Sequence, residues 1–377
     1  MAIALISTPA SIAAAYNEMI FDVSSTNAGQ TNFQFITDVY VSGVFKSRLI
    51  FPKQPSTNKV KINISPVVKN YLTYDLDNVY TNLTPKPNTN SQIDYQVKYG
   101  EIYDVGGVRS AFTNLKTDST RYGVKMVLDP LQGTAITGYD ASAFGFLINQ
   151  TTVEIKKNDR LFMSWYDPGG VVYSIRLSSS TTQIIANTVV ANNYLYNQNV
   201  GYDILSNTLK SEILTNGYYK VGLYDFGDNL LGSEIRVNVD TCTQLYTNYR
   251  LHWLNQYGGW ESINFNKVST QKSEINRNIY KIPTPIGYTI NDRLKRQFQT
   301  TITDKVAINT DWLTDTQLDW IRGLFESPIV FYEQGSNMIP VQLTNASYDT
   351  QYYTNGRKLH NVTAEMEYSY NRYRQEQ

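Results

Sequence analysis

The sequence has few of the residues that most often carry chemistry. Its 377 residues include one cysteine and two histidines. A single cysteine excludes an intrachain disulfide and a cysteine-based zinc site, and two histidines exclude a histidine-rich metal site. We therefore expect no metal ion and no cofactor.

Excess charge and long apolar runs are also missing. The 33 Lys and Arg residues balance the 33 Asp and Glu residues. A neutral chain has no overall field that attracts nucleic acid or an anionic membrane, so we expect no nucleic-acid sequence recognition and no membrane insertion. No run of about 18 apolar residues is present to span a bilayer.

The N-terminal 16 residues are small and apolar and end near Ala13-Ala14-Ala15, which resembles a signal-peptide cleavage site. However, no Lys or Arg precedes this run, and Pro9 interrupts it. We favour an N-terminal arm that leads into a first strand at Ile20–Val23.

Candidate catalytic residues lie outside recognisable motifs. We expect His252 to be packed in a core, His360 to be exposed and Cys242 to be a buried, inert thiol. Glu365 and Glu367 alternate on one predicted strand, as a pair of glycosidase carboxylates could, but a solvated strand face explains them equally well. The sequence therefore predicts a protein that is not an enzyme.

The residues that are abundant favour β-structure. The chain has 30 tyrosines, and short segments repeatedly alternate apolar with more polar residues between turns. Clear examples are Tyr95-Val97-Tyr99, Leu161-Met163-Trp165 and Tyr173-Ile175-Leu177. This period of two is typical of strands in sandwiches and barrels, so the predicted class is mainly β.

Three domains are predicted. Residues 1–137 and 138–241 read as β-sandwich modules, and 242–377 as an α+β domain. In the second module, Asp167-Pro168-Gly169-Gly170 predicts a hairpin turn. The segments 217–223 and 233–239 resemble the last two strands of an immunoglobulin-like or fibronectin-like sandwich.

The third domain contains the clearest helix signal. Thr314 and Gln317 have the spacing of a capping box, in which each side chain bonds the other residue's backbone. Apolar residues then recur at helical spacing, at Leu318, Ile321, Leu324 and Phe325. These residues predict one amphipathic helix whose apolar face is part of the scaffold.

An aromatic segment precedes that helix, at residues 249–265. It reads Tyr249, Leu251, Trp253-Leu254-Asn255, Tyr257-Gly258-Gly259-Trp260-Glu261-Ser262 and Phe265. The pattern predicts two strands joined by a Gly-Gly turn. The segment resembles structural proteins of tailed bacteriophages, especially those that infect Bacteroidota. Tyr16-Asn17 and Asp38–Val41 are similar to the same group.

The resemblance implies a tail-tube-like C-terminal domain and a virion structural protein. The expected place is a distal-tail, baseplate or tail-ring position, and the expected partners are other copies of the chain in a ring and other tail proteins. The protein would be made in the host cytoplasm and reside in the virion. Under this reading, Trp253, Gly258, Gly259 and Trp260 maintain the scaffold or its interface.

A second hypothesis starts from the tyrosines. Tyrosine is enriched at interfaces, it packs well in strands, and exposed rings can stack on sugars. Tyr194 and Tyr352 lie in Asn-rich, loop-like surroundings and are the candidate stacking residues. The alternative function is therefore a carbohydrate-binding adhesion module that recognises a host surface glycan.

Overall fold

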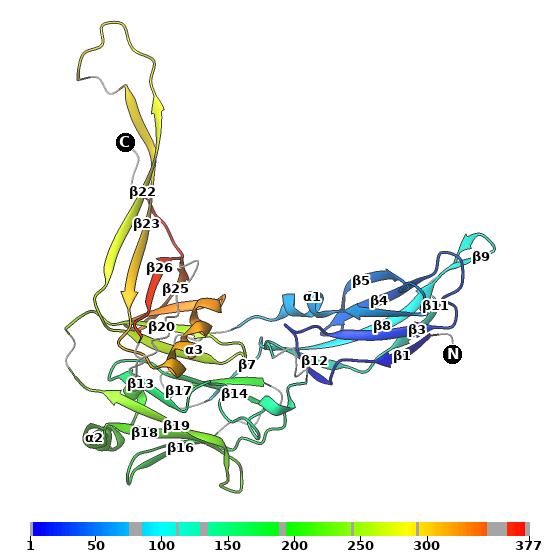
Figure 1. Cartoon of the computed structure of the whole chain (residues 1–377), viewed down its shortest axis with the longest axis horizontal. Helices are drawn as coiled ribbons and strands as arrows, with labels where there is room; N and C mark the ends of the chain where they lie inside the picture. The colour runs from blue at the N-terminus through cyan, green and yellow to red at the C-terminus, as the bar shows by residue number, and fades with distance from the viewer. Residues whose placement is uncertain are drawn as a thin grey trace. The chain divides into compact units, whose positions relative to one another are not determined.

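The computed structural model describes residues 3–74, 85–110, 113–128, 135–187, 194–242, 245–291, 294–344 and 360–373. These residues are mainly β, which confirms the predicted class (Figure 1). The chain divides into two compact units. Unit 1 is Met1–Val239 with Asn255–Trp260, and unit 2 is Asp240–Leu254 with Glu261–Gln377.

The N-terminal part of unit 1 contains two main sheets around one apolar core. The first has the order β1 (Ile3–Ser7), β3 (Ile20–Ser25), β6 (Lys59–Asn63). The second has the order β2 (Ile12–Ala14), β12 (Arg121–Val124), β8 (Gln92–Ile102), β4 (Gln34–Val41), β5 (Val44–Pro52), with β11 (Thr113–Thr117) also on β8. A small hairpin joins β9 (Asp104–Val105) to β10 (Val108–Arg109). Tyr95, Val97 and Tyr99 of β8 are all buried, so the predicted inward face is confirmed.

The second part of unit 1 is built from two further sheets. One has the order β13 (Thr152–Lys156), β19 (Leu230–Asp240), β18 (Tyr218–Tyr224), β15 (Ser174–Ser178), β16 (Gln183–Asn187). The other has the order β14 (Phe162–Asp167), β17 (Tyr194–Asn199), β7 (Lys86–Asn88). Their facing apolar side chains form one core cluster.

The predicted hairpin at Asp167–Gly170 is wrong, because β14 pairs with β17 whereas β15 pairs with β16 and β18. The Asp167 carboxylate accepts hydrogen bonds from the backbone N–H groups of Val171, at 2.9 Å, and Val172, at 3.0 Å. These bonds hold a corner that carries the chain from one sheet into the other.

The helices in the described part of unit 1 are short. They are α1 (Ser65–Val68), η1 (Lys69–Tyr71), η3 (Thr137–Tyr139), η4 (Tyr202–Ile204) and α2 (Asn207–Asn216). The Ser206 side chain caps α2 by accepting from Leu209 N, and Gly217 ends the helix with φ +78°. Leu209 and Ile213 anchor its inner face in the core.

Unit 2 centres on one eight-stranded sheet. Its order is β21 (Trp260–Phe265), β20 (Tyr249–Leu254), β24 (Val330–Gln334), β25 (Asn337–Leu343), β26 (Thr363–Tyr368), β23 (Lys295–Asn309), β22 (Thr270–Lys281), with β27 (Arg372–Tyr373) also on β23. The helix α3 (Asp315–Glu326) contributes to the core that this sheet shares.

The predicted capping box and helix are confirmed in α3. Thr314 Oγ1 accepts from Gln317 N at 3.3 Å, and Gln317 Oε1 accepts from Thr314 N at 3.0 Å. The helix buries Leu318 and Ile321 in the unit 2 core, and half-buried Phe325 packs beside them.

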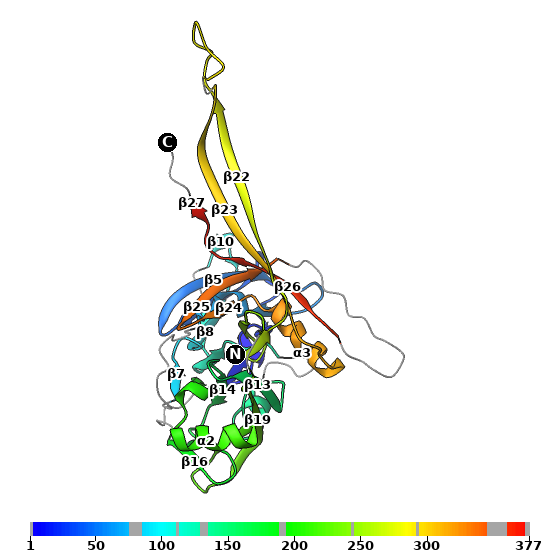
Figure 2. The ribbon, with the colours of Figure 1, turned by 90° about the vertical axis from the view of Figure 1, so that its left-hand side faces the viewer.

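The strands β22 and β23 form an antiparallel ribbon that continues past the ends of β25 and β26 (Figures 1 and 2). β26 pairs with β23 only between Lys305 and Asn309, and β27 pairs with it only at Thr301 and Ile302. In the described part of the chain, residues 295–300 of β23 therefore pair with β22 alone.

Candidate functional site

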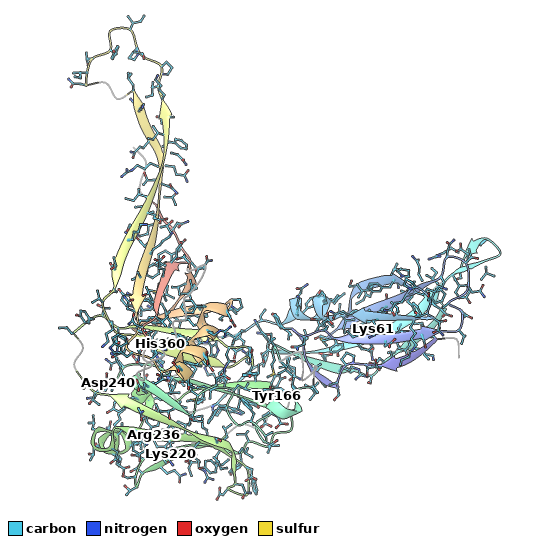
Figure 3. All side chains as sticks on the ribbon, viewed as in Figure 1. Lys61, Tyr166, Lys220, Arg236, Asp240 and His360 are labelled. Atoms are coloured by element: carbon cyan, nitrogen blue, oxygen red, sulfur yellow. The ribbon has the colours of Figure 1, made fainter. Side chains whose placement is uncertain are left out.

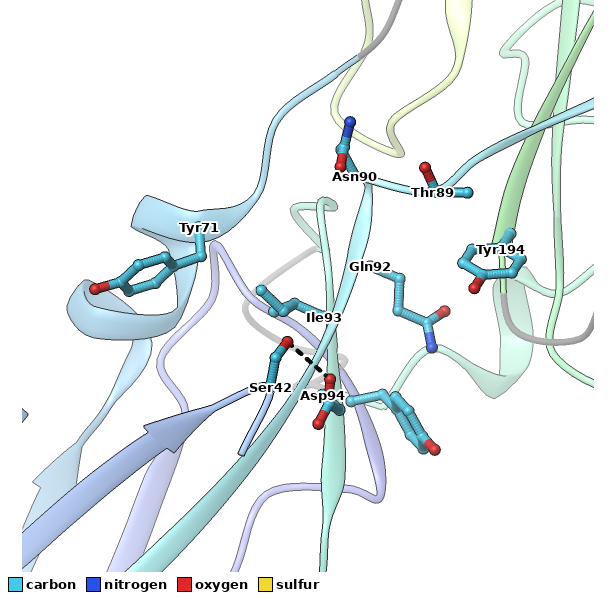
Figure 4. A pocket seen from close by; sticks show the side chains of 9 residues that line it. Ser42, Tyr71, Thr89, Asn90, Gln92, Ile93, Asp94 and Tyr194 are labelled. Atoms are coloured by element: carbon cyan, nitrogen blue, oxygen red, sulfur yellow. Dashed lines mark hydrogen bonds between the residues drawn. The ribbon is translucent and has the colours of Figure 1, made fainter. Parts of the chain in front are cut away.

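A cavity of about 310 Å³ in unit 1 gathers side chains suited to holding a small ligand (Figure 4). It combines three tyrosines with hydroxyl, amide and carboxylate groups. The lining residues are Ser42, Tyr71, Thr89, Asn90, Gln92, Ile93, Asp94, Tyr122 and Tyr194. This volume lies at the lower end of the range for small-molecule sites.

Regular sheet structure positions most of this cavity. Asp94 lies on β8 directly opposite Tyr122 of β12, and Ser42 follows the last residue of β4. The Asp94 carbonyl oxygen accepts from Ser42 N at 3.0 Å, and Asp94 Oδ1 accepts from Ser42 Oγ at 3.0 Å (Figure 4). Tyr194 is the first residue of β17, which pairs with β7. Strand pairing therefore fixes Asp94 and Tyr122 in one sheet and Tyr194 in another, whereas Tyr71 lies in η1.

Gln92 is the one described lining residue with a buried side-chain atom that has no hydrogen-bond partner. It is 9% exposed, and its Oε1 has no hydrogen-bond partner among the described residues. A buried acceptor without a partner costs free energy, so native structures rarely leave one unless a ligand, ion or water supplies the bond. Gln92 thus marks where a hydrogen-bond donor is expected.

The sequence singled out one residue of this cavity. Tyr194 is half-buried and lines the wall, whereas Tyr352 lies outside the described residues. Sequence reasoning missed Gln92, Asp94 and Ser42. These residues lie in or beside ordinary strands, and only the pairing of β4, β8 and β12 brings them together.

The Gly-Gly segment forms a hydrogen-bonded turn in unit 1. Asn255 Oδ1 accepts from the backbone N–H groups of Tyr257, at 3.0 Å, and Gly259, at 2.9 Å. Its Nδ2 donates to the carbonyl oxygen of Leu147 at 2.9 Å. Gly258 has φ +80°, a conformation that suits glycine. One asparagine side chain therefore organises the whole turn.

The residues around that turn are tightly packed. A Cβ atom on Gly258 would lie 2.6 Å from the Lys125 carbonyl oxygen. Trp260 is 1% exposed, its backbone N–H donates to Ser164 Oγ at 3.1 Å, and its ring meets the Tyr74 ring edge-on at 5.1 Å. These contacts give Gly258 and Trp260 a structural role within unit 1.

Trp253 lies in the core of unit 2. It is fully buried on β20, and its ring centroid is 5.0 Å from that of Trp320 on α3. Trp320 Nε1 donates to Glu261 Oε2 at 2.6 Å. The aromatic pair therefore fixes α3 against the sheet of the same unit.

A buried charged cluster also occurs in unit 2. Arg250 and His252 are at most 1% exposed, and Glu333 is 9% exposed. Glu333 Oε2 lies 2.9 Å from His252 Nε2 and 3.6 Å from Arg250 Nε. The prediction that His252 is packed in the core is confirmed. The three side chains are thus enclosed within unit 2.

Two of the other sequence predictions are wrong. His360, labelled in Figure 3, was expected to be exposed, but it is 6% exposed, and its Nε2 lies 2.8 Å from Asp315 Oδ1. Its backbone pairs with that of Leu313, which places the ring against the start of α3. Cys242 was expected to be buried, but it is exposed.

Within the described ranges, no three or more His, Cys, Asp or Glu side chains are grouped closely enough to hold a metal ion. Of the helices in those same ranges, none has the length and apolar character needed to cross a bilayer.

Comparisons with known proteins add little. No family model and no curated protein matches the sequence. Among solved structures, the chain is similar to the full extracellular region of plexin A4, with 8% sequence identity and a TM-score of 0.19. The match covers 97% of this chain and 40% of the plexin chain.

Proposed function

We propose that this chain is a non-enzymatic structural protein of a phage virion, a distal-tail, baseplate or tail-ring component. In this proposal, residues 1–137 and 138–241 form sandwich modules of the immunoglobulin or fibronectin kind, and 242–377 form a tail-tube-like domain that closes a ring. The resemblance of residues 249–265 to tailed-phage structural proteins supports the assignment.

The β22–β23 ribbon is the observation that carries this proposal. Ile275 and Ile279 of β22 are 47% and 56% exposed, and Tyr280 is 43% exposed. A two-stranded ribbon is marginally stable in water, and an open apolar edge strand invites pairing with another chain. A closed ring of identical subunits supplies such a neighbour to every edge.

The proposal also defines partners and location. The partners are other copies of this chain and further tail proteins, and the protein is made in the host cytoplasm and resides in the virion. It needs no cofactor, recognises no nucleic-acid sequence and inserts into no membrane.

The test is the mass of the purified chain by light scattering, with negative-stain images of the same sample. We expect a ring for the parent chain. Ile279→Asp should release monomers, because a charge on β22 opposes packing against a neighbour. Ile185→Asp is the matched control, since Ile185 is also 53% exposed on an edge strand, β16 of unit 1. A parent chain that stays monomeric at all concentrations, or rings that survive Ile279→Asp, would contradict the proposal.

The cavity at Tyr194 favours a second candidate function, a carbohydrate-binding adhesion module for a host glycan. Its ligand can be argued from the lining residues.

A further inference from the structure

We infer that the cavity at Tyr194 binds an uncharged saccharide. The inference rests on the second candidate function and names its site and ligand class. It does not require ring assembly, because all the lining residues belong to one unit of one chain.

The aromatic wall of the cavity suits a sugar ring. A pyranose ring presents an apolar C–H face, which packs on the flat face of a tyrosine while the phenol tip keeps its contact with polar groups. The side chain of Lys46 already lies over the Tyr71 ring, with Nζ 4.7 Å from the ring centroid. We therefore assign the main stacking surface to Tyr194, with Tyr122 as a second aromatic wall.

The cavity also offers hydrogen-bond acceptors to sugar hydroxyls. Gln92 Oε1 is buried without a partner among the described residues. Asp94 Oδ1 accepts from the hydroxyl of Ser42, and no side chain among the described residues donates to the second carboxylate oxygen, which can receive a ligand donor. Adjacent sugar hydroxyls donate to two such acceptors at once, and the hydroxyls of Ser42 and Thr89 add groups that both donate and accept.

The charge of the cavity favours a neutral ligand. Among the described residues that line the cavity, Asp94 is the only ionisable group besides the tyrosines. A carboxylate in a partly enclosed site repels a second carboxylate and attracts hydroxyl donors. The cavity should therefore prefer neutral sugars over uronic or sialic acids.

The test is saturation-transfer NMR with titration, on the full chain. The probes are methyl glucopyranoside, methyl galactopyranoside, N-acetylglucosamine, the β1,4-linked disaccharides of glucose and of N-acetylglucosamine, and glucuronic acid. We expect saturable binding of at least one neutral probe and binding of glucuronic acid at least tenfold weaker. Tyr194→Ala should weaken binding at least tenfold, and Tyr194→Phe should retain it.

Two further variants sharpen the test. Tyr173→Ala is the matched control, because Tyr173 is 37% exposed in the same unit and does not line the cavity. It should bind as the parent does. Asp94→Asn keeps a hydrogen-bond acceptor but removes the charge. It should therefore reduce the difference in affinity between the neutral probes and glucuronic acid.

Several results would overturn the inference. They are no saturable binding of any neutral probe, binding unchanged in Tyr194→Ala, an equal loss in Tyr173→Ala, or equal affinity for glucuronic acid and the neutral probes. Ring assembly is scored separately by light scattering. A monomer that binds sugar defeats only the assembly proposal, and a ring that binds none defeats only this inference.

Discussion

Gly259 lies so close to Leu147 that no side chain fits between them. A Cβ atom on Gly259 would be 2.2 Å from the carbonyl oxygen of Leu147, well below any normal contact distance. The same carbonyl oxygen accepts from Asn255 Nδ2, and Asn255 Oδ1 accepts from the backbone N–H of Gly259. The two glycines of this turn are therefore required for different reasons. Gly258 supplies a positive φ, and Gly259 supplies space.

The first prediction concerns Gly259→Ala. The added methyl group must displace the Leu147 backbone and disturb the Asn255 bonds, so the free energy of unfolding should fall by about 3 kcal/mol, the upper end for overpacking. Denaturation in urea measures the change. Gly29→Ala is the control, because its Cβ would meet nothing within 4 Å. If both variants unfold at the parent's midpoint, the close contact described here does not exist.

The second prediction concerns the cap of α3. Thr314→Ala removes the acceptor for Gln317 N, and the expected loss is about 1 kcal/mol. Thr316→Ala is the matched control, since Thr316 is an exposed residue in the first turn of the same helix. Thermal unfolding followed by circular dichroism should show a melting temperature below that of the parent only for Thr314→Ala. Equal midpoints would argue against the capping box.

Elements with strong local signals were predictable from the sequence. The helix α3 has a capping box and an apolar stripe, and both are local properties of the chain. The helix α2 was not predicted, because only Leu209 and Ile213 form its buried face. The strand β22 was also missed. Both of its faces are largely exposed, so its residues show no period-two pattern, and its pairing with β23 defines it.

Long-range pairing explains the other differences. The turn at Asp167–Gly170 has hairpin residues, yet its flanking strands find partners in separate sheets. His360 was expected to be exposed, but Asp315 and Leu313, more than forty residues earlier, bury it. The cavity follows the same rule. Composition pointed to Tyr194, and only tertiary structure brings Gln92 and Asp94 to it.

The third prediction concerns the buried cluster of unit 2. Glu333→Ala removes the carboxylate that faces Arg250 and His252, so the buried guanidinium loses its counter-charge. The expected loss is about 3 kcal/mol, in the range for breaking a buried ion pair. Glu326→Ala is the control, because the pair of Glu326 with Arg322 is exposed and should contribute less than about 0.5 kcal/mol.

A double variant separates charge from packing in that cluster. Arg250→Met with Glu333→Leu removes both charges together and should recover most of the stability lost in Glu333→Ala. Urea denaturation measures all four proteins. If the double variant is less stable than Glu333→Ala, the loss of the counter-charge does not explain the effect of Glu333→Ala.

The fourth prediction is a pH dependence that arises at Glu212 of α2. Hydrogen bonds from the hydroxyl groups of Thr181 and Thr182, and from their backbone N–H groups at 3.3 and 3.1 Å, hold the pKa of its carboxyl at about 2, below the ordinary 4.5. A carboxyl whose pKa is lower in the folded state than in the unfolded state stabilises the folded state at pH values above the unfolded pKa. This contribution disappears as the pH falls from about 4.5 to 2. The parent should therefore have a higher melting temperature than Glu212→Gln at pH 6. The difference should disappear as the pH falls from about 4.5 to 2. Since hydrogen bonds carry the effect, the gap should persist in 1 M NaCl. A gap in melting temperature that is constant from pH 6 to pH 2 would assign the stabilisation to another group.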